Sequence, residues 1–174
     1  MGTDKGLIFN YLKNLTWVEI LFFMLTELNF EVFVSINLSQ FDSYSKIIDS
    51  KNLIIDQSDY QGPICGLISA HQLYPKEDFL VLACDMQNVN KSLILQLISN
   101  YAINQMTTFY KNDDNFIEPF PAIYAKNIFE NQLINSNIGP ISLLKKEQKA
   151  NEILIIKEIK HLFSNFNTKT DLER

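Results

Sequence analysis

The chain has few cysteines and no long apolar run. Its 174 residues include only two cysteines, Cys65 and Cys84, and both lie in apolar or glycine-flanked segments. They are typical of reduced core thiols in a cytosolic protein and argue against a disulfide framework. No apolar stretch reaches transmembrane length, and no basic leader with a cleavage site opens the sequence. We therefore expect a cytoplasmic protein without a membrane span.

Positive charge is in deficit. Fifteen lysines and arginines against 20 aspartates and glutamates give a net charge of -5. This balance argues against a nucleic-acid binder, and any phosphate ligand must be held by local positive groups. The length fits one domain, which we expect to span residues 1–174.

Several well-known catalytic motifs are also missing. The sequence contains no GxSxG, HExxH or complete Walker pattern. Its two histidines, His71 and His161, have no cysteine or further histidine at ligand spacing, which argues against a zinc site.

Apolar runs alternate with helical segments over the first hundred residues. This alternation predicts an α/β fold with a parallel sheet and right-handed crossovers. The expected strands lie at 31–37, 53–56 and 79–85, and the expected helices at 17–28, 41–48, 67–73 and 90–101. The second half predicts a hairpin (106–110 and 116–124), helices at 125–134 and 141–149, a strand at 152–156 and an extended piece at 161–167. A terminal helix capped by Thr168 is expected to follow.

The run from Phe79 to Asp85 is apolar until it stops at a carboxylate. Such a run predicts a strand buried on both faces, and ligands of α/β sheets bind beyond the carboxyl ends of the strands. An unpaired buried carboxylate is costly, so Asp85 is a candidate ligand of Mg²⁺ held against a phosphate. A loop aspartate that caps the next helix explains the residue equally well.

Other polar residues allow both a functional and a structural interpretation. Lys5, between an acid and a glycine, is suited to neutralising a phosphate, although lysines are usually solvated. Asp56 ends a second apolar strand, and Gly62 and Gly66 would let the backbone approach a ligand. A tight connection between strand and helix accounts for these glycines as often.

Asn165 and Asn167 place two amides on one side of an expected strand. They are suited to ordering a phosphate oxygen or a water. Satisfying backbone groups at a strand end is the structural alternative.

The order of these motifs is more specific than any one of them, and it resembles the molybdenum cofactor guanylyltransferases. Enzymes of that family are nucleotidyltransferases that couple GMP from GTP to molybdopterin. The likeness covers nearly the whole chain and rests on Met1-Gly-x-Asp-Lys-Gly-Leu7, Asp56 with Gly62-Pro-x-x-Gly66, Cys84-Asp85, Pro119-x-x-Ala122-x-Tyr124 and Asn165-x-Asn167-Thr168.

The resemblance implies a three-layer, Rossmann-like nucleotidyltransferase fold of the GT-A-like type, with a mostly parallel sheet and a mixed second half. It implies a Mg²⁺-dependent transferase that uses GTP and molybdopterin, with molybdoenzyme-maturation proteins as possible partners. The implied roles are GTP phosphate contact for Lys5, nucleoside contact for Asp56, Gly62 and Gly66, a position near the base for Asn37, Mg²⁺ binding for Asp85, and the pterin-phosphate side for Asn165 and Asn167.

The sequence departs from the family pattern at three places. An N-terminal strand and a Leu-Ala-Gly-Gly-x-Ser-x-Arg loop should precede Met1, so we expect the sequence to begin inside that motif and the sheet to lack a central strand. Gln87 replaces a usual proline, and residues 139–142 lack the family's arginine. Two alternatives therefore stay open: a non-catalytic relative that binds a nucleotide or a partner, and a related nucleotidyltransferase with another substrate or acceptor.

Overall fold

The computed structural model describes residues 4–56, 60, 62–129, 139–147, 149–164 and 166. The α-helices are α1 (Trp17–Glu27), α2 (Phe41–Tyr44), α3 (Pro63–Leu73), α4 (Lys91–Ala102) and α5 (Pro140–Lys146). The strands are β1 (Phe9–Asn10), β2 (Leu15–Thr16), β3 (Val34–Ile36), β4 (Leu53–Ile55), β5 (Phe79–Val81), β6 (Thr108–Lys111), β7 (Ile117–Tyr124) and β8 (Asn151–Leu154). Five 3₁₀ helices complete the described elements: η1 (Lys5–Leu7), η2 (Leu38–Gln40), η3 (Ser50–Asn52), η4 (Lys126–Phe129) and η5 (Lys157–Phe163).

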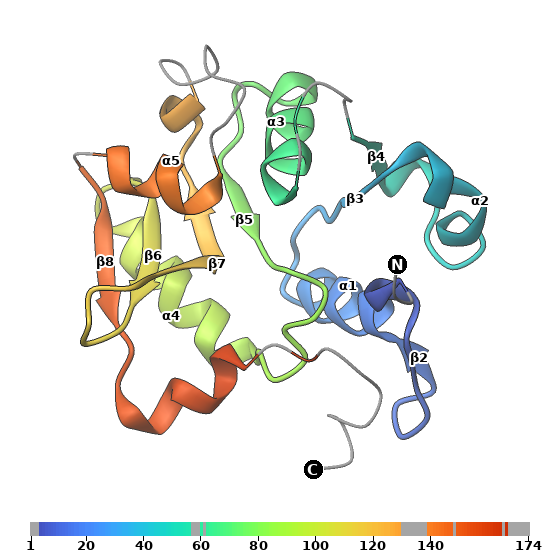
Figure 1. The fold of residues 1–174 in the computed structure, drawn as a ribbon, viewed down its shortest axis with the longest axis horizontal. Coiled ribbons are helices and arrows are strands. Elements are labelled where there is room, and N and C mark those ends of the chain that lie inside the picture. Colours follow the sequence, from blue (N-terminus) through green and yellow to red (C-terminus); the bar gives the residue numbers. More distant parts are fainter. Residues whose placement is uncertain are drawn as a thin grey trace.

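The second half of the chain forms a mixed four-stranded sheet in the order β5-β7-β6-β8. Strand β7 runs antiparallel to both β5 and β6, whereas β8 runs parallel to β6. The hairpin and the mixed second half predicted from the sequence are therefore confirmed (Figure 1).

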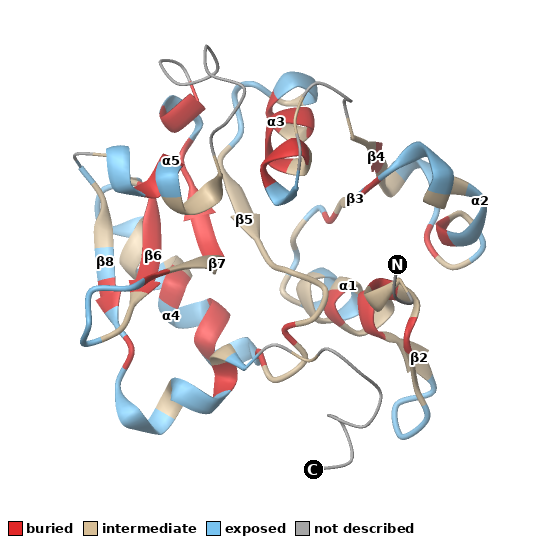
Figure 2. Ribbon diagram, viewed as in Figure 1, coloured by how far each residue is buried: buried red, intermediate tan, exposed pale blue. Residues whose placement is uncertain are grey.

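Helices cover both faces of this sheet. Phe109 packs with α3 and α5, while its neighbour Tyr110 packs with α4 on the opposite face. Because successive side chains of a strand point to opposite faces, β6 and β7 contribute to two separate cores. Figure 2 shows these two strands as the most buried part of the sheet. The three-layer α/β arrangement thus follows from apolar residues on both faces of the central strands.

Strands β3 and β4 form a separate parallel pair, and β1 and β2 form a small antiparallel one. Within the described residues no ladder joins β3 to β5, although β3 is the member of its pair that lies nearer to β5 (Figure 1).

Two helices connect the separate sheets. The amino-terminal part of α1 packs on the β3–β4 pair through Val18, and its carboxyl-terminal part, with Leu25, joins the core under Leu80 of β5. On the opposite face, α3 buries Leu67 against β6 and β7 and places Gly66 against Ser35 of β3. The relative position of the two sheets therefore depends on α1 and α3.

Two of the α-helices begin at residues whose side chains cap them. Thr16 and Glu19 form the capping box that starts α1, and Asn90 caps α4 by accepting a hydrogen bond from the Leu93 N–H at 3.0 Å. No helix in the part of the chain that the structure describes is long and apolar enough to cross a membrane.

The strand predicted at 79–85 is shorter and less buried than expected. It ends at Val81, all three of its residues are half-buried, and it pairs antiparallel with β7. The apolar run overstated its burial because one edge of β5 meets no strand among the described residues. Cys84 and Asp85 instead form a turn beyond the strand.

The extended piece predicted at 161–167 is also wrong over its described part. Residues 157–163 form η5, in which Ile159, Leu162 and Phe163 share one face against the α4 core. The spacing of three to four residues, rather than two, is helical. Of the helix predicted at 125–134, residues 126–129 form η4; residues 130–134 and the terminal helix predicted after Thr168 lie outside the described residues.

Candidate functional site

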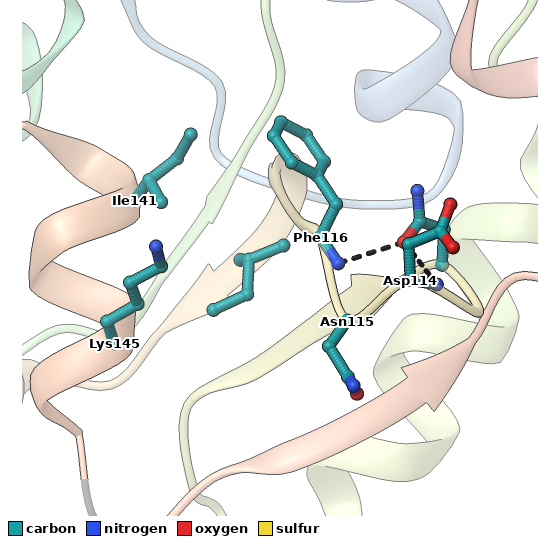
Figure 3. Close-up of a pocket in the computed structure, with 7 residues that line it drawn as sticks. Asp114, Asn115, Phe116, Ile141 and Lys145 are labelled. Carbon is teal, nitrogen blue, oxygen red and sulfur yellow. Dashed lines mark hydrogen bonds between the residues drawn. The ribbon is translucent and has the colours of Figure 1, made fainter.

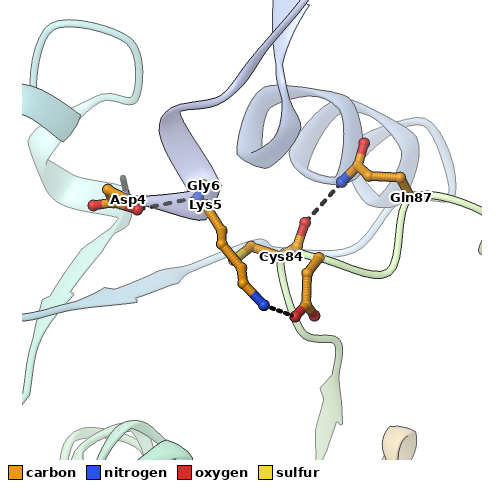
Figure 4. Close-up of polar contacts among 6 residues, drawn as sticks. Asp4, Lys5, Gly6, Cys84 and Gln87 are labelled. Carbon is orange, nitrogen blue, oxygen red and sulfur yellow. Dashed lines mark hydrogen bonds and ion pairs between the residues drawn. The ribbon is translucent and has the colours of Figure 1, made fainter. Parts of the chain in front are cut away.

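Lys5 and Asp85, 80 residues apart in sequence, form an ion pair. The ammonium nitrogen of Lys5 lies 2.8 Å from Oδ2 of Asp85 (Figure 4). The Asp85 side chain is only 17% exposed, against 36% for Lys5, so the carboxylate is the more desolvated partner. A partly buried carboxylate needs such a countercharge, because burial without one costs several kcal/mol.

The main chain around Lys5 is fixed by Asp4. One carboxylate oxygen of Asp4 accepts hydrogen bonds from the Gly6 N–H (3.0 Å) and the Tyr44 hydroxyl (2.9 Å), and the other accepts one from Gln40. Burial and the bond to Asp4 raise the pKa of Tyr44 far above its ordinary value, so this tyrosine stays a neutral donor. Asp4 therefore anchors η1 to the segment that follows β3.

The turn that carries Asp85 is fixed by Gln87. Its side-chain NH₂ donates to the carbonyl of Cys84 at 2.7 Å (Figure 4). It also donates to the carbonyl of Trp17 at 3.4 Å. The Phe166 N–H donates to the Asp85 carbonyl at 3.0 Å. These bonds connect the turn to the start of α1 and to the carboxyl-terminal part of the chain.

Cys84 is held as a neutral thiol beside the ion pair. Burial raises its pKa to about 11, the negative charges of Asp85 and Asp4 add to the rise, and the Lys5 ammonium opposes it. The same three charged groups therefore act on one thiol. A neutral thiol is a poor ligand for a hard cation, which leaves the Asp85 carboxylate as the metal-binding candidate in this turn.

Asp56 lies at the carboxyl end of the β3–β4 pair. Its carboxylate accepts a hydrogen bond from the Ser35 hydroxyl, and its N–H donates to the Ile36 carbonyl at 2.8 Å. Gly66 of α3 packs directly on Ser35: a Cβ at this position would lie 3.0 Å from the Ser35 Cβ, overlap its hydroxyl, and lie 3.6 Å from Asp56 Oδ1. The helix can approach the strand this closely only because residue 66 has no side chain.

Gly62 and Asn37 occupy turn positions. Gly62 precedes α3 with φ 73°, a conformation that residues other than glycine rarely adopt. Asn37 follows β3, is exposed, and donates its N–H to the side-chain oxygen of Gln40 at 2.8 Å.

Asn37, Asp56 and Asp85 thus follow β3, β4 and β5 in turn, and a hydrogen bond joins Lys5 to Asp85. Asp56 and Asn37 belong to the β3–β4 side, and their roles stay predictions. Asn165 and Asn167 lie outside the described residues. Within the described ranges, no three acidic, histidine or cysteine side chains group as a metal site.

Sequence reasoning missed three residues that position the site: Asp4 and Gln87, which Figure 4 shows, and Ser35. Asp4 had a local signal, because an aspartate two residues before a glycine is suited to accepting that residue's N–H in a turn. The bond of Ser35 to Asp56 and that of Gln87 to Trp17 span 21 and 70 residues, separations for which a single sequence carries no signal.

A hollow of about 450 Å³ lies elsewhere, between the β6–β7 connection and α5 (Figure 3). It is lined by Asn112, Asp114, Asn115, Phe116, Ile117, Ile141 and Lys145. None of the predicted site residues contributes to it. The ion pair and its anchoring network are the better candidate site, because the pair joins two of the predicted site residues.

Comparison with known proteins assigns the family. Residues 1–150 match the MobA-like NTP transferase domain. The chain belongs to this family. The match covers most of the 174 residues and confirms the resemblance inferred from the order of the motifs.

Two MobA-like relatives are each 28% identical to the chain. One is a molybdenum cofactor biosynthesis bifunctional protein of Synechocystis, matched over 149 residues, which are 83% of this chain and 42% of the relative. The other is a probable molybdenum cofactor guanylyltransferase of Methanocaldococcus jannaschii, with 64% and 59% covered. The chain thus spans less than two thirds of these relatives.

A solved structure shares the fold. The molybdopterin-guanine dinucleotide biosynthesis protein A of Archaeoglobus fulgidus superposes with a TM-score of 0.75 at 19% identity. The superposition covers 99% of this chain and 88% of that protein. The MobA-like fold therefore extends over nearly the whole chain.

Proposed function

We propose that this MobA-like chain transfers GMP from GTP to molybdopterin and releases pyrophosphate. The observation that carries the proposal is the Lys5–Asp85 ion pair at the carboxyl ends of the strands, where α/β sheets bind their ligands. The names of the relatives, which include a probable molybdenum cofactor guanylyltransferase, support GTP and molybdopterin as the substrates.

The residues present fit a Mg²⁺ ion. Among the described residues, Oδ1 of Asp85 accepts no hydrogen bond, whereas Oδ2 receives Lys5. Mg²⁺ is commonly held by one or two carboxylates together with substrate phosphates, so one carboxylate in this turn suffices. When bound by Asp85, the ion would neutralise negative charge on the triphosphate.

The chain's own residues would bind and orient the substrate. Lys5 would leave Asp85 and donate to phosphate oxygens, where its charge favours the transition state of in-line attack on the α-phosphate. Asp56 and the Gly62 turn would face the nucleoside. Transfer of this kind needs positioning and charge neutralisation and little covalent chemistry from the protein.

The experiment is pyrophosphate release from GTP, Mg²⁺ and molybdopterin with the wild type and the Asp85→Ala and Lys5→Met variants. We expect each variant to lose at least about a hundredfold in rate, because each removes one charge that acts on the transition state. Lys51→Met serves as the control, since Lys51 is 77% exposed and, among the described residues, pairs only with Asp49 on the surface.

No pyrophosphate release by the wild type would refute the proposal. Equal rates for the wild type and the Asp85→Ala variant would refute the assigned role of Asp85. Pyrophosphate release with CTP in place of GTP would show that the nucleotide substrate carries cytosine and not guanine.

A further inference from the structure

The Lys5–Asp85 pair presents a conflict between two proposed tasks, and the following inference rests on the proposed function. The Lys5 ammonium lies 2.8 Å from Oδ2 of Asp85. A cation that binds Oδ1 of Asp85 would share one carboxylate with the Lys5 ammonium on Oδ2, and the two positive charges would repel each other. A phosphate that binds Lys5 would compete with the Asp85 carboxylate for the same ammonium. Each ligand therefore binds less tightly while the ion pair is closed.

The surroundings make the closed pair favourable. The side chain of Asp85 is only 17% exposed, so its carboxylate has lost much of its hydration. The Lys5 ammonium, 2.8 Å away, supplies the charge that compensates for this loss. Removing Lys5 would leave the Asp85 carboxylate without that charge, which is costly in a partly buried site.

A free divalent cation gains little by entering alone. It would lose part of its hydration, displace the ammonium, and leave Lys5 without its carboxylate partner; Mg²⁺ in particular dehydrates reluctantly. A polyphosphate changes this balance because it offers Lys5 new oxygen acceptors while it brings ligands for the cation. The two bindings are then coupled, and the coupling is reciprocal.

We propose that Lys5 is a resident counter-ion that keeps Asp85 from binding a divalent cation until a polyphosphate takes over the lysine. Cation and nucleotide therefore bind together, as a complex. By the same coupling, Asp85 keeps Lys5 from binding a polyphosphate that arrives without a cation.

The first test measures Mn²⁺ binding without nucleotide, by the loss of the free-ion EPR signal. Lys5→Met is expected to bind Mn²⁺ at least about tenfold more tightly than the wild type, a coupling of about 1.4 kcal/mol. The double variant Lys5→Met/Asp85→Asn is expected to lose that gain. Lys51→Met removes the same charge at an exposed site and is expected to bind like the wild type.

The second test measures tripolyphosphate binding by calorimetry in EDTA. Asp85→Asn removes the carboxylate that binds the Lys5 ammonium and is expected to bind tripolyphosphate about tenfold more tightly than the wild type. Asp49→Asn makes the same charge change beside Lys51 and is expected to have no effect. In the Mn²⁺ test, Lys5→Gln replaces Lys5→Met should the latter not fold, because glutamine keeps a hydrogen-bond donor towards Asp85.

Equal Mn²⁺ affinity of the wild type and the Lys5 variant overturns the counter-ion role. If pyrophosphate release is still normal in that case, the proposed transfer stands. An equal gain in Lys51→Met also overturns the role, because the effect would then come from net charge. If no variant binds Mn²⁺ and Asp85→Ala retains full transfer activity, both the counter-ion role of Lys5 and the metal-binding role of Asp85 are refuted.

Discussion

Gly66→Ala tests whether α3 depends on its close approach to β3. The added Cβ would lie 3.0 Å from the Ser35 Cβ and overlap the Ser35 hydroxyl. Ser35 must rotate away, and it then loses its hydrogen bond to Asp56. Overpacking of this kind costs about 1–3 kcal/mol. Loss of a hydrogen bond to a charged group costs about 1.5–3 kcal/mol, the lower value applying here because Ser35 is exposed.

Alanine also favours the helix. Gly→Ala in a helix interior contributes about 1 kcal/mol of stability, which offsets part of the cost. The net expectation is a loss of about 2 kcal/mol, or a fall in Tm of about 4–8 °C for a chain of this size. Urea unfolding followed by circular dichroism measures the free energy, with Ser35→Ala and the double variant Ser35→Ala/Gly66→Ala completing a double-mutant cycle.

The cycle isolates the contact. Ser35→Ala removes the hydroxyl that collides with the new Cβ, so Gly66→Ala is expected to cost at least about 1 kcal/mol less in that background. If the two single effects add within about 0.5 kcal/mol, the overlap with Ser35 is not the cause and the reasoning is refuted. A stabilising effect of Gly66→Ala in the wild-type background would refute it equally.

Two further predictions concern the open sheet edges and the buried thiol. A valine-rich strand of about five residues joined ahead of Met1 is expected to slow amide exchange at Val34–Ile36 and Phe79–Val81 at least about tenfold, because those strands would gain ladder partners. A glycine–serine segment of equal length is the control, and equal exchange in both extended chains contradicts the prediction. In a Cys65→Ala background, the rate of Cys84 alkylation by iodoacetamide is expected to rise with a midpoint near pH 11, shifted down by Asp85→Asn and up by Lys5→Met. Because the folded pKa lies above the ordinary value of 9.0, the folded chain keeps a proton that the unfolded chain loses, so this group lowers stability as pH rises from 9 to 11. An alkylation midpoint near 9 would contradict the burial of this thiol.

Much of the fold could be predicted because its signals are local. The capping box at Thr16 and the N-cap at Asn90 are short-range patterns, and the turn at 112–115 separates two clear strands. The extent of β5 could not be predicted, because an apolar run records the residues' hydrophobicity and not the number of neighbouring strands. Residues 157–163 were mispredicted because apolar side chains three residues apart were interpreted as part of a strand.

The charged residues of the candidate site could be identified from the sequence, but the residues that support them could not. Lys5 and Asp85 were identified because an unpaired buried carboxylate is costly and a lysine can neutralise a phosphate, and the family resemblance linked them. The segments that carry them are held by Asp4 and Gln87, whose bonds to Gln40 and Trp17 span 36 and 70 residues of sequence. Such contacts exist only once the sheets and α1 are in place.

The position of η1 explains how one site can combine residues that follow strands of two separate sheets. Asp4 bonds to Gln40 and Tyr44, which follow β3, whereas Lys5 bonds to Asp85, which follows β5. Two adjacent residues therefore connect the carboxyl ends of strands that share no ladder within the described chain. A ligand that draws Lys5 away from Asp85 removes one of these connections and leaves that of Asp4. Helices α1 and α3 pack on opposite faces and hold the two sheets together. The Lys5 ammonium could therefore move from the Asp85 carboxylate to a phosphate, and so change the charge of the site, without any separation of the sheets.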